Sequence, residues 1–171
     1  MIKTKSDKFI EQEENKKKTE ESLETKVIQI DRVARVVAGG RRFKFRATVV
    51  VGDKKGHVGI GVGKGNDVNK AINKATYYGK KSMIEVPIYK STLPYSIKSK
   101  YGSAQVLLKP ASPGTGLIAG GTVRAVLELA GVQDVLSKIL GSANKINNLK
   151  ATFLALKKIR DLYLKKQNLK K

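Results

Sequence analysis

Residues 43–65 read FKFRATVVVGDKKGHVGIGVGKG, and this stretch decides the fold of the first half of the chain. Side chains from Phe43 to Val51 alternate between two faces, which predicts a strand with one buried face. The segment GDKKG at 52–56 has glycine at both ends, as in a hairpin loop. Residues 57–65 return as a second strand with Val and Ile on one face and mostly glycine on the other. The stretch therefore predicts a β-hairpin.

The glycine face of the strand at 57–65 has two interpretations. Glycine inside a strand marks close approach by another backbone, either a helix of the same unit or an RNA strand. The segment KGHVG faintly resembles an RNA-recognition-motif signature, but His57 and Gly59 stand at its aromatic positions. Stacking of single-stranded bases on this sheet is therefore not expected.

A strand and a helix are predicted on either side of this hairpin. VIQIDRVARVV at 27–37 is β-branched and alternating, and the loop AGGRR at 38–42 connects it to the hairpin. Residues 66–83 have apolar side chains at helical spacing. Residues 27–83 thus predict a β-β-β-α unit, an antiparallel sheet with a helix on one face. The expected buried stripe of the helix is Val68, Ala71, Ile72, Ala75 and Tyr78.

A second unit follows a segment that contains two prolines, and its pattern is β-α-β-α. Arg124 and Glu128 are expected to pair one turn apart on its first helix. The fold class is α+β with two small α/β domains. The predicted elements are a strand at 103–110, a Gly/Pro loop at 111–121, a helix at 122–131, a strand at 132–140 and a helix at about 146–164. The predicted boundaries are a disordered charged extension at 1–24, domains at 25–90 and 91–164, and a basic tail at 165–171.

The net charge points to a polyanionic partner. The 171 residues include 35 Lys and Arg against 14 Asp and Glu, a net charge of +21. Residues 1–24 contain six lysines and seven acids, so the remaining 147 residues contain 29 basic and seven acidic side chains. A body this basic repels itself unless a polyanion neutralises it, which favours nucleic acid as the partner.

Composition argues against several classes of protein. The absence of cysteine removes disulfides and thiolate metal sites, and a single histidine, His57, removes His-cluster metal sites. The seven acids after residue 24 are scattered and show no catalytic pairing. No metal, cofactor or small-molecule substrate is expected, and the chain is not expected to be an enzyme. No apolar run suits a membrane or a secretory signal, so a cytoplasmic location is expected.

Two glycine-containing stretches have a chemistry of their own. At the first, Gly39 and Gly40 permit a tight turn or close contact with a ligand, and Arg41 and Arg42 offer planar donors that suit phosphate. Arg32 and Arg35 precede this tip. A solvated hairpin turn is the simpler alternative, but the local absence of acids favours phosphate binding.

The second stretch, from Gly114 to Ala119, fits the pattern G-x-G-x-x-A, and Asp134 lies twenty residues after Gly114, as in a dinucleotide-binding fingerprint. Pro110 and Pro113 break the strand-to-helix turn that such a site requires. An anion cradle for RNA phosphate, or a close protein contact, suits this loop better.

The chain resembles the bacterial-type family of small-subunit ribosomal protein five over about residues 30–156. Three stretches show the resemblance: RVARVVAGGRRFKFRATVVVGDKKGHVGIGVGKG, KPASPGTGLIAGG and RAVLELAGVQDVLSKILGSAN. The resemblance implies an N-terminal domain similar to a double-stranded-RNA-binding domain (dsRBD) and a C-terminal α/β domain of the family's own type.

The resemblance also implies partners and site residues. Arg32, Val33, Ala34 and Arg35 would border the spectinomycin pocket, where Ala34 and Ala38 replace residues that are often polar or basic in relatives. Small-subunit ribosomal proteins four and eight are implied partners, as is messenger RNA (mRNA) on the side where it enters the subunit. Gly114, Thr115, Gly116 and Arg124 would contact protein four, an interface linked to decoding accuracy. The expected ribosomal-RNA-binding residues are Arg32, Arg35, Gly39, Gly40, Arg41, Arg42, Lys44, Arg46, Lys54, Lys55, His57, Lys64, Lys70 and Lys74.

The sequence thus predicts a structural constituent of the small ribosomal subunit that binds ribosomal RNA through basic loops and contributes to subunit assembly. Two alternatives remain at this point. One is a free double-stranded-RNA-binding module, and the other is a nucleotide-dependent kinase that uses the Gly114 loop.

Overall fold

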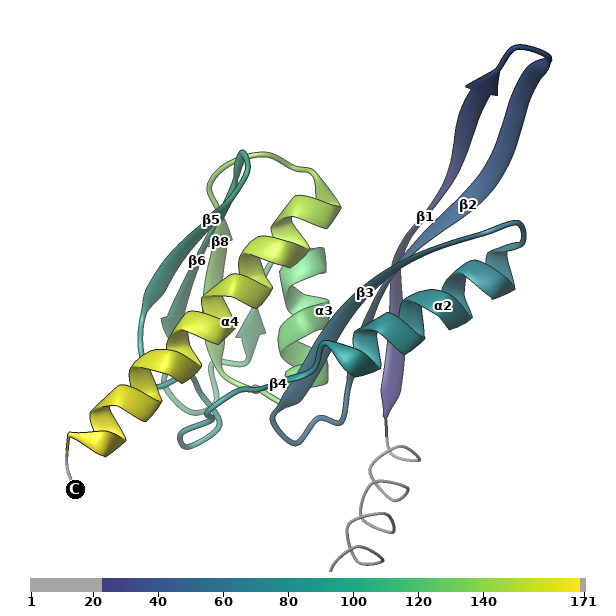
Figure 1. The fold of residues 1–171 in the computed structure, drawn as a ribbon. Coiled ribbons are helices and arrows are strands. Elements are labelled where there is room, and N and C mark those ends of the chain that lie inside the picture. Colours follow the sequence, from purple (N-terminus) through teal and green to yellow (C-terminus); the bar gives the residue numbers. More distant parts are fainter. Residues whose placement is uncertain (1–22, 170–171) are drawn as a thin grey trace, which may run out of the picture.

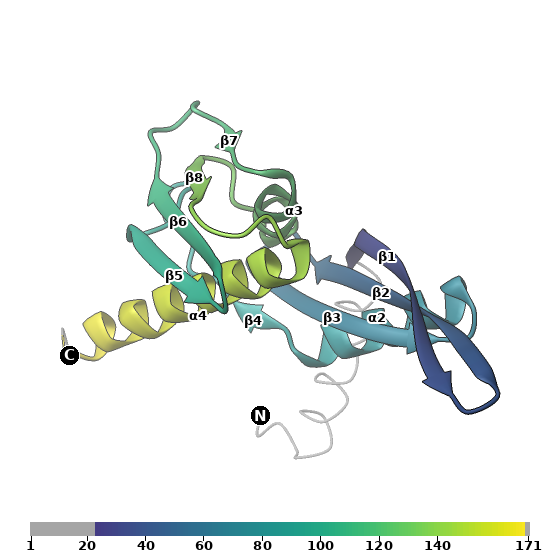
Figure 2. The same ribbon diagram turned by 90° about the horizontal axis from the view of Figure 1, so that it is seen from above.

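The computed structural model describes residues 23–169, so the disorder expected for residues 1–22 and the end of the basic tail lie outside the described residues. Figures 1 and 2 show two sheets with helices packed against them, which confirms the predicted α+β class. The elements are β1 (Glu24–Val37), β2 (Gly40–Gly52), β3 (His57–Gly65), α2 (Val68–Lys81), β4 (Ile84–Glu85), β5 (Ile97–Tyr101), β6 (Ala104–Pro110), β7 (Leu117–Ile118), α3 (Gly121–Ala130), β8 (Val135–Ile139) and α4 (Lys145–Asn168). Among residues 23–169, no helix is long and apolar enough to cross a membrane.

The first sheet has the order β1-β2-β3-β4, and its first two strands extend far beyond the third. β1 and β2 pair from Glu24 opposite Gly52 to Val37 opposite Gly40. β3 pairs with β2 only as far as Phe45. Beyond this point the hairpin is a two-stranded ribbon that projects from the body (Figure 1).

The turn at the end of this ribbon is shorter than predicted. Only Ala38 and Gly39 form the turn, and Gly40 already belongs to β2 with a φ of 133°. Arg41 and Arg42 are therefore strand residues and not part of a loop. They pair with Val36 and Arg35 of β1.

The other half of β2 is buried on both faces. Ala47, Val49 and Val51 pack against Ala71 and Ala75 of α2. The opposite face contributes Val50 to a larger cluster that also contains residues of α3 and α4. All five residues from Ala47 to Val51 have 0% exposure. The first sheet is thus held between its own helix and the second domain, and the larger of the two buried clusters contains residues of both domains.

The glycine face of β3 lies against α2. A methyl group at Gly61 would overlap the carbonyl oxygen of Ala75, and one at Gly59 would overlap that of Gly79. Of the two interpretations of this glycine face, the structure confirms close approach by the helix of the same unit. Because the backbones approach so closely, only small residues fit along the contact. The prediction that Tyr78 is buried is therefore wrong: it is 44% exposed, and Gly79 is buried in its place.

The second sheet has the order β5-β6-β8-β7 and contains two strands that were not predicted, β5 and β7. β5 pairs with β6 in an antiparallel hairpin, and the two-residue β7 runs parallel to β8. The predicted inward residues of α3 are buried, including Val123, Val126 and Leu127. α4 continues to Asn168, four residues past its expected end, and so includes part of the predicted basic tail.

Main-chain hydrogen bonds join the two domains at the loop that connects β2 and β3. The amides of Lys54 and Gly56 donate to the carbonyl oxygens of Leu129 and Ala130 at the end of α3, both at 3.0 Å. Gly131 has a φ of 82°, and a methyl group there would overlap the carbonyl oxygen of Lys54. The loop is therefore a fixed contact between the domains.

Because β3 and α2 approach so closely, adding one methyl group to a glycine of β3 should destabilise the fold. Gly61→Ala should lower the free energy of unfolding by about 3 kcal/mol, because the backbone of α2 must move to accept it. Urea unfolding followed by circular dichroism measures the change. The control is Gly39→Ala, where a methyl group meets no atom within 4 Å, and which should change stability by less than about 0.5 kcal/mol. Equal stability of the two variants would contradict the packing described here.

Candidate nucleic-acid interface

One face of the projecting hairpin is a row of cations. Residues directly opposite each other in an antiparallel pair lie on the same face, and alternate residues of one strand share a face. Arg42 lies opposite Arg35, and Arg46 lies opposite Lys64 of β3. We call this row the cationic face: Arg35, Arg42, Lys44, Arg46 and Lys64.

The other face of the hairpin combines cations with aromatic rings. The guanidinium carbon of Arg32 lies 3.8 Å from the ring centroid of Phe43, within cation–π range. Phe43 is 47% exposed, and Arg41 lies further along the same face. The sequence assigned Phe43 only a packing role. Phe43 lies close to a glycine turn, where the third strand does not reach, and this position could have predicted that its ring is exposed.

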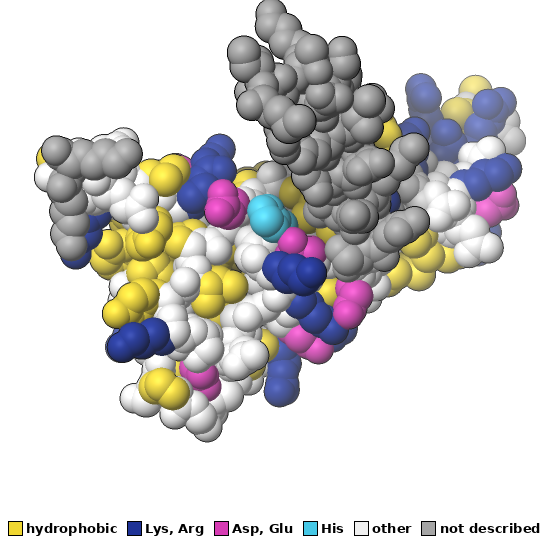
Figure 3. Space-filling view, turned by 90° about the horizontal axis from the view of Figure 1, so that it is seen from below, with side chains coloured by type: hydrophobic (Ala, Val, Ile, Leu, Met, Phe, Trp, Pro, Cys, Tyr) yellow, Lys and Arg dark blue, Asp and Glu magenta, His cyan; other side chains and the backbone are white. Residues whose placement is uncertain are grey.

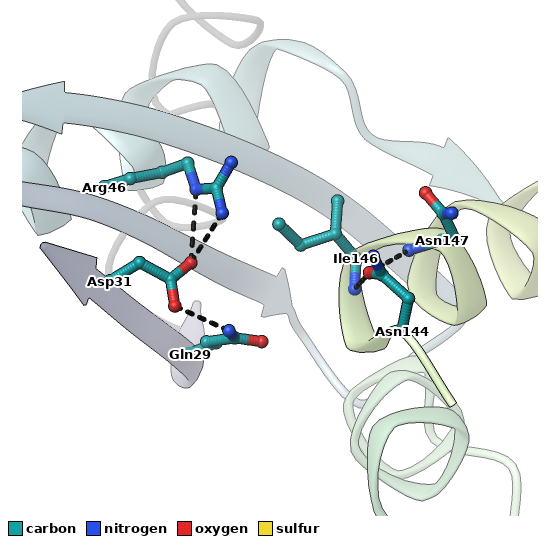
Figure 4. A network of polar contacts seen from close by, with 6 residues as sticks. All are labelled: Gln29, Asp31, Arg46, Asn144, Ile146 and Asn147. Carbon is teal, nitrogen blue, oxygen red and sulfur yellow. Dashed lines mark hydrogen bonds and ion pairs between the residues drawn. The ribbon is translucent and has the colours of Figure 1, made fainter. Parts of the chain in front are cut away.

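Within residues 23–169, no carboxylate lies at salt-bridge distance from Arg35, Arg41 or Arg42. The nearest acid on the cationic face is Asp31, which accepts hydrogen bonds from Arg46 at 2.8 Å and from Gln29 at 2.6 Å (Figure 4). The bond from Arg46, followed by that from Gln29, lowers the pKa of Asp31. Arg46 is thus held by an acid, while the arginines nearer the tip are open to a ligand.

The expected site residues Lys54, Lys55 and His57 lie at the opposite end of β2 from the tip. Asp53 is buried there, and it accepts from the amides of Lys55 and His57 and contacts the His57 ring at 2.7 Å. Burial opposes ionisation of Asp53, but these hydrogen bonds outweigh it and lower the pKa. Figure 3 shows this end, where the histidine lies among acidic and basic side chains. This mixture of charges contrasts with the purely cationic tip.

The remaining expected RNA-binding residues are separated from the tip. Lys70 and Lys74 are exposed on α2, and Lys70 pairs with Asp67 at 3.3 Å. The structure thus divides the fourteen expected residues into the hairpin with the adjoining Lys64 of β3, the loop at 52–56 with the adjoining His57, and the exposed face of α2. Only the hairpin set forms a continuous row.

The Gly114 loop is exposed and is held from inside by an acid. Gly114 and Gly116 have φ values of 87° and 75°, and a methyl group at either would meet nothing within 4 Å. The amide of Gly116 donates to the Asp134 carboxylate at 2.9 Å, and Ser91 Oγ donates to its other oxygen at 2.7 Å. The bond from Ser91, followed by that from Gly116, lowers the pKa of Asp134. The acid that mimics a dinucleotide fingerprint therefore shapes the loop.

Arg124 and Glu128 line a cavity of about 490 Å³ together with Leu117 from the same loop and Lys54 from the other domain. The predicted pairing of these two helical residues is wrong among the described residues. Glu128 instead accepts from Lys26 Nζ at 2.9 Å, across the domain boundary. Arg124 is left exposed beside the Gly114 loop. Leu117, which follows the expected interface residues Gly114, Thr115 and Gly116, thus lines the same cavity as Arg124.

Sequence comparisons match both domains to one family. Residues 23–87 match the N-terminal domain of ribosomal protein S5, and residues 99–168 match its C-terminal domain. The chain belongs to the ribosomal protein S5 family. This confirms the resemblance inferred from the sequence.

Relatives in several bacteria are similar over most of their length. The chain is 52% identical to small ribosomal subunit protein uS5 of Thermus thermophilus over 141 residues, which is 82% of this chain and 87% of that protein. Identity to uS5 of Chloroflexus aurantiacus is 51% over 141 residues, which is 82% of this chain and 79% of that protein. Identity to uS5 of Lawsonia intracellularis is 52% over 139 residues, with 81% and 85% covered. Because S5 proteins are structural proteins of the ribosome, the expectation that this chain is not an enzyme is confirmed.

The Asp134 contact predicts a pH-dependent contribution to stability. A carboxyl whose pKa is lowered in the folded state stabilises the fold at any pH above its ordinary pKa, which is 3.8 for Asp134. This stabilisation is lost as the pH falls through the lower pKa of the folded state. Asp134→Asn should therefore lower the urea midpoint at pH 7, and the gap to the unsubstituted protein should narrow below pH 3.8. Urea unfolding across this pH range measures both. A gap that does not change with pH would contradict a role for the charge.

Proposed function

We propose that the chain is a structural component of the small ribosomal subunit, in the bacterial cytoplasm, and that it binds small-subunit ribosomal RNA chiefly through the β1–β2 hairpin. The observation that supports this most strongly is the projecting ribbon, whose tip arginines have no acidic partner among residues 23–169. Family membership supports the ribosomal setting. The hairpin is long and narrow, and in this proposal it reaches between RNA segments that a flat surface could not touch.

The two faces of the hairpin suit different parts of RNA. Guanidinium groups on the cationic face, such as those of Arg35 and Arg42, bind phosphate through paired donors. On the other face, the Arg32–Phe43 pair offers a flat surface to an unstacked base. In this proposal phosphate contacts supply most of the affinity, and RNA shape supplies specificity.

The residues expected at the spectinomycin pocket do not share one face. Arg32 and Ala34 lie on the aromatic side of the ribbon, and Val33 and Arg35 lie on the cationic side. We propose that the ribbon borders the pocket edge-on, so that residues of both faces reach it. Its rigid pairing would then fix the position of the pocket wall.

The Gly114 loop is proposed as the contact with ribosomal protein four, which relates the chain to decoding accuracy. The support is its exposure, its open glycines and the exposed Arg124 beside it. Basic residues of the first domain are proposed to face mRNA on the side where it enters the subunit, and Lys70 and Lys74 are proposed as contacts to ribosomal RNA. Ribosomal protein eight is proposed as a further neighbour, to which no particular surface is assigned.

Reversing the charge at the hairpin tip tests the proposed function. Arg41→Glu with Arg42→Glu should leave the fold intact, because both side chains are exposed. The loss of two charge-assisted phosphate contacts should weaken binding to small-subunit ribosomal RNA roughly 100-fold. The slope of log affinity against log salt should fall by about 2. Filter binding at several salt concentrations measures both, and the variant should be depleted from small subunits in cells.

The matched control is Lys98→Glu with Lys100→Glu on β5, which changes the net charge equally at exposed positions away from the hairpin. This variant should bind with less than about a tenfold loss, as a distant charge acts only through screened interactions. Equal losses in the two variants would contradict a role for the hairpin. Sedimentation of a lysate at moderate salt separates the ribosomal role from a free double-stranded-RNA-binding module, which would stay out of the small-subunit fraction.

A further inference from the structure

A cavity lined by aromatic rings lies between the segment that joins the two domains and the end of α4. Its volume is about 500 Å³, which is within the range that holds a nucleotide-sized ligand. Three of the six tyrosines of the chain line it. Sequence reasoning gave these tyrosines no binding role, because they are far apart in the chain and meet only in the folded structure. The lining residues are Tyr89, Pro94, Tyr95, Tyr163, Lys166 and Gln167.

One side of the cavity is built on a turn that is fixed to the second domain. The Tyr89 amide donates to the carbonyl oxygen of Thr92 at 2.8 Å, and the Thr92 amide donates back to Tyr89 at 3.0 Å. Within this turn, the carbonyl oxygen of Ser91 accepts from the amides of Gln133 and Asp134 at 2.9 and 3.1 Å. The backbone that presents the Tyr89 ring is therefore held in place before any ligand binds.

The other side of the cavity is one face of α4. Tyr163, Lys166 and Gln167 are three and four residues apart, so they lie together on the helix surface. Tyr163 is half-buried, whereas Tyr89 across the cavity is 57% exposed. Hydrophobic side chains gather at this end of the molecule (Figure 3). An exposed apolar surface around a cavity is typical of a binding site.

The charged groups of the cavity favour a polyanion. The ammonium nitrogens of Lys90 and Lys166 each lie 5.6 Å from a ring centroid, that of Tyr89 and that of Tyr95 respectively, within cation–π range. Among residues 23–169, neither lysine has a carboxylate at salt-bridge distance, and no acidic side chain lines the cavity. The site thus combines aromatic faces with cations that have no acidic partner in the described chain.

We propose that this cavity binds one unstacked nucleotide of ribosomal RNA, with its base against the tyrosine rings and its phosphates near Lys90 and Lys166. Rings beside cations are the combination that binds single-stranded nucleic acid, because every base has a face that stacks. Cation–π contacts at exposed sites are weak, so a base displaces the lysines from the rings toward its own phosphates. The Gln167 side chain offers a donor and an acceptor to the edge of the base.

This inference rests on the proposed function and adds a second RNA contact to it. The end of α4 and the tip of the hairpin lie on opposite sides of the molecule (Figure 1), so the two contacts bind separate RNA segments. Aromatic grooves also bind proline-rich peptides. The cations around the rings favour RNA over such a peptide, and the experiment below distinguishes the two ligands.

Nuclear magnetic resonance of the complete protein tests the cavity directly. Titration with adenosine 5′-monophosphate should shift the ring-proton resonances of Tyr89, Tyr95 and Tyr163 upfield in a saturable way, because a stacked base shields them. Ribose 5-phosphate, which has no base, should not shift them. The absence of a saturable shift with the nucleotide would overturn the proposal. Shifts with decaproline but not with the nucleotide would also overturn it, in favour of a peptide groove.

Tyr89→Leu tests whether ribosomal RNA uses the cavity, because leucine keeps an apolar side chain and removes the ring. Affinity for purified small-subunit ribosomal RNA should fall about tenfold, the effect of losing one stacked base. The slope of log affinity against log salt should not change, because stacking releases no counterions. Filter binding measures both, and circular dichroism checks that the variant is folded.

Two further variants are matched controls. Tyr89→Phe keeps the ring and should bind within about twofold of the unsubstituted protein, as stacking is retained. Tyr77→Leu makes the same substitution at a residue of α2 that is 65% exposed and lies outside the cavity. It should change affinity by less than about twofold, as is usual for a surface position without a ligand contact.

The outcomes separate this proposal from the proposed function. If the unsubstituted protein binds RNA and Tyr89→Leu binds equally well, the cavity proposal fails while the hairpin function stands. If the unsubstituted protein does not bind ribosomal RNA at all, the proposed function fails, and the cavity proposal fails with it. If Tyr89→Leu impairs subunit assembly with unchanged RNA affinity, the cavity serves a protein contact, and the proposal is overturned.

Discussion

The structure depends on the burial of one half of strand β2 on both of its faces. An isolated two-stranded ribbon is only marginally stable in water, and the ribbon here is also crowded with like charges. From Ala47 to Val51 the strand has no exposed surface, because α2 covers one face and α3 with the second domain covers the other. This buried half fixes the register and direction of the strand. The exposed half of β2 continues with the same register and direction, so the hairpin holds its arginines at a distance from the body.

The distribution of acids follows from the same arrangement. Most carboxylates of the described chain have structural partners: Asp31 holds Arg46, Glu128 holds Lys26 across the domains, and Glu24 bonds to Lys54. Each of these pairs lies in the body or at the base of the hairpin. The acids therefore neutralise cations in the body and at the base of the hairpin, and they leave the tip arginines without an acidic partner among the described residues. A ligand with many phosphates therefore meets unpaired arginines at the tip.

Local patterns in the sequence predicted most of the elements, and tertiary contacts account for what they missed. Alternation along residues 43–51 and helical spacing around Leu149 and Leu156 predicted the correct elements, because Ala47, Val49 and Val51 of the strand and both leucines of the helix are buried. The strand at 97–101 is rich in lysine and forms only by pairing with β6. Charge identified the hairpin residues of the site, but the segment AGGRR did not show which residues of the two strands lie opposite each other. That Arg35 lies opposite Arg42 follows only from the two-residue turn at Ala38 and Gly39.

The main-chain bonds between the loop at 52–56 and the end of α3 give the two domains a defined relative orientation. Lys54 and Gly56 donate backbone hydrogen bonds across the boundary. Gly52 and Gly131 let the loop and the end of α3 approach so closely that no side chain fits at either position. Contacts on one rigid body bind a folded RNA without a separate ordering cost for each, because the first contact already positions the second. Neither domain alone holds the hairpin and the Gly114 loop at a fixed distance. In the proposed function, the glycines at this boundary contribute to RNA binding indirectly, by fixing how the cationic surfaces are arranged.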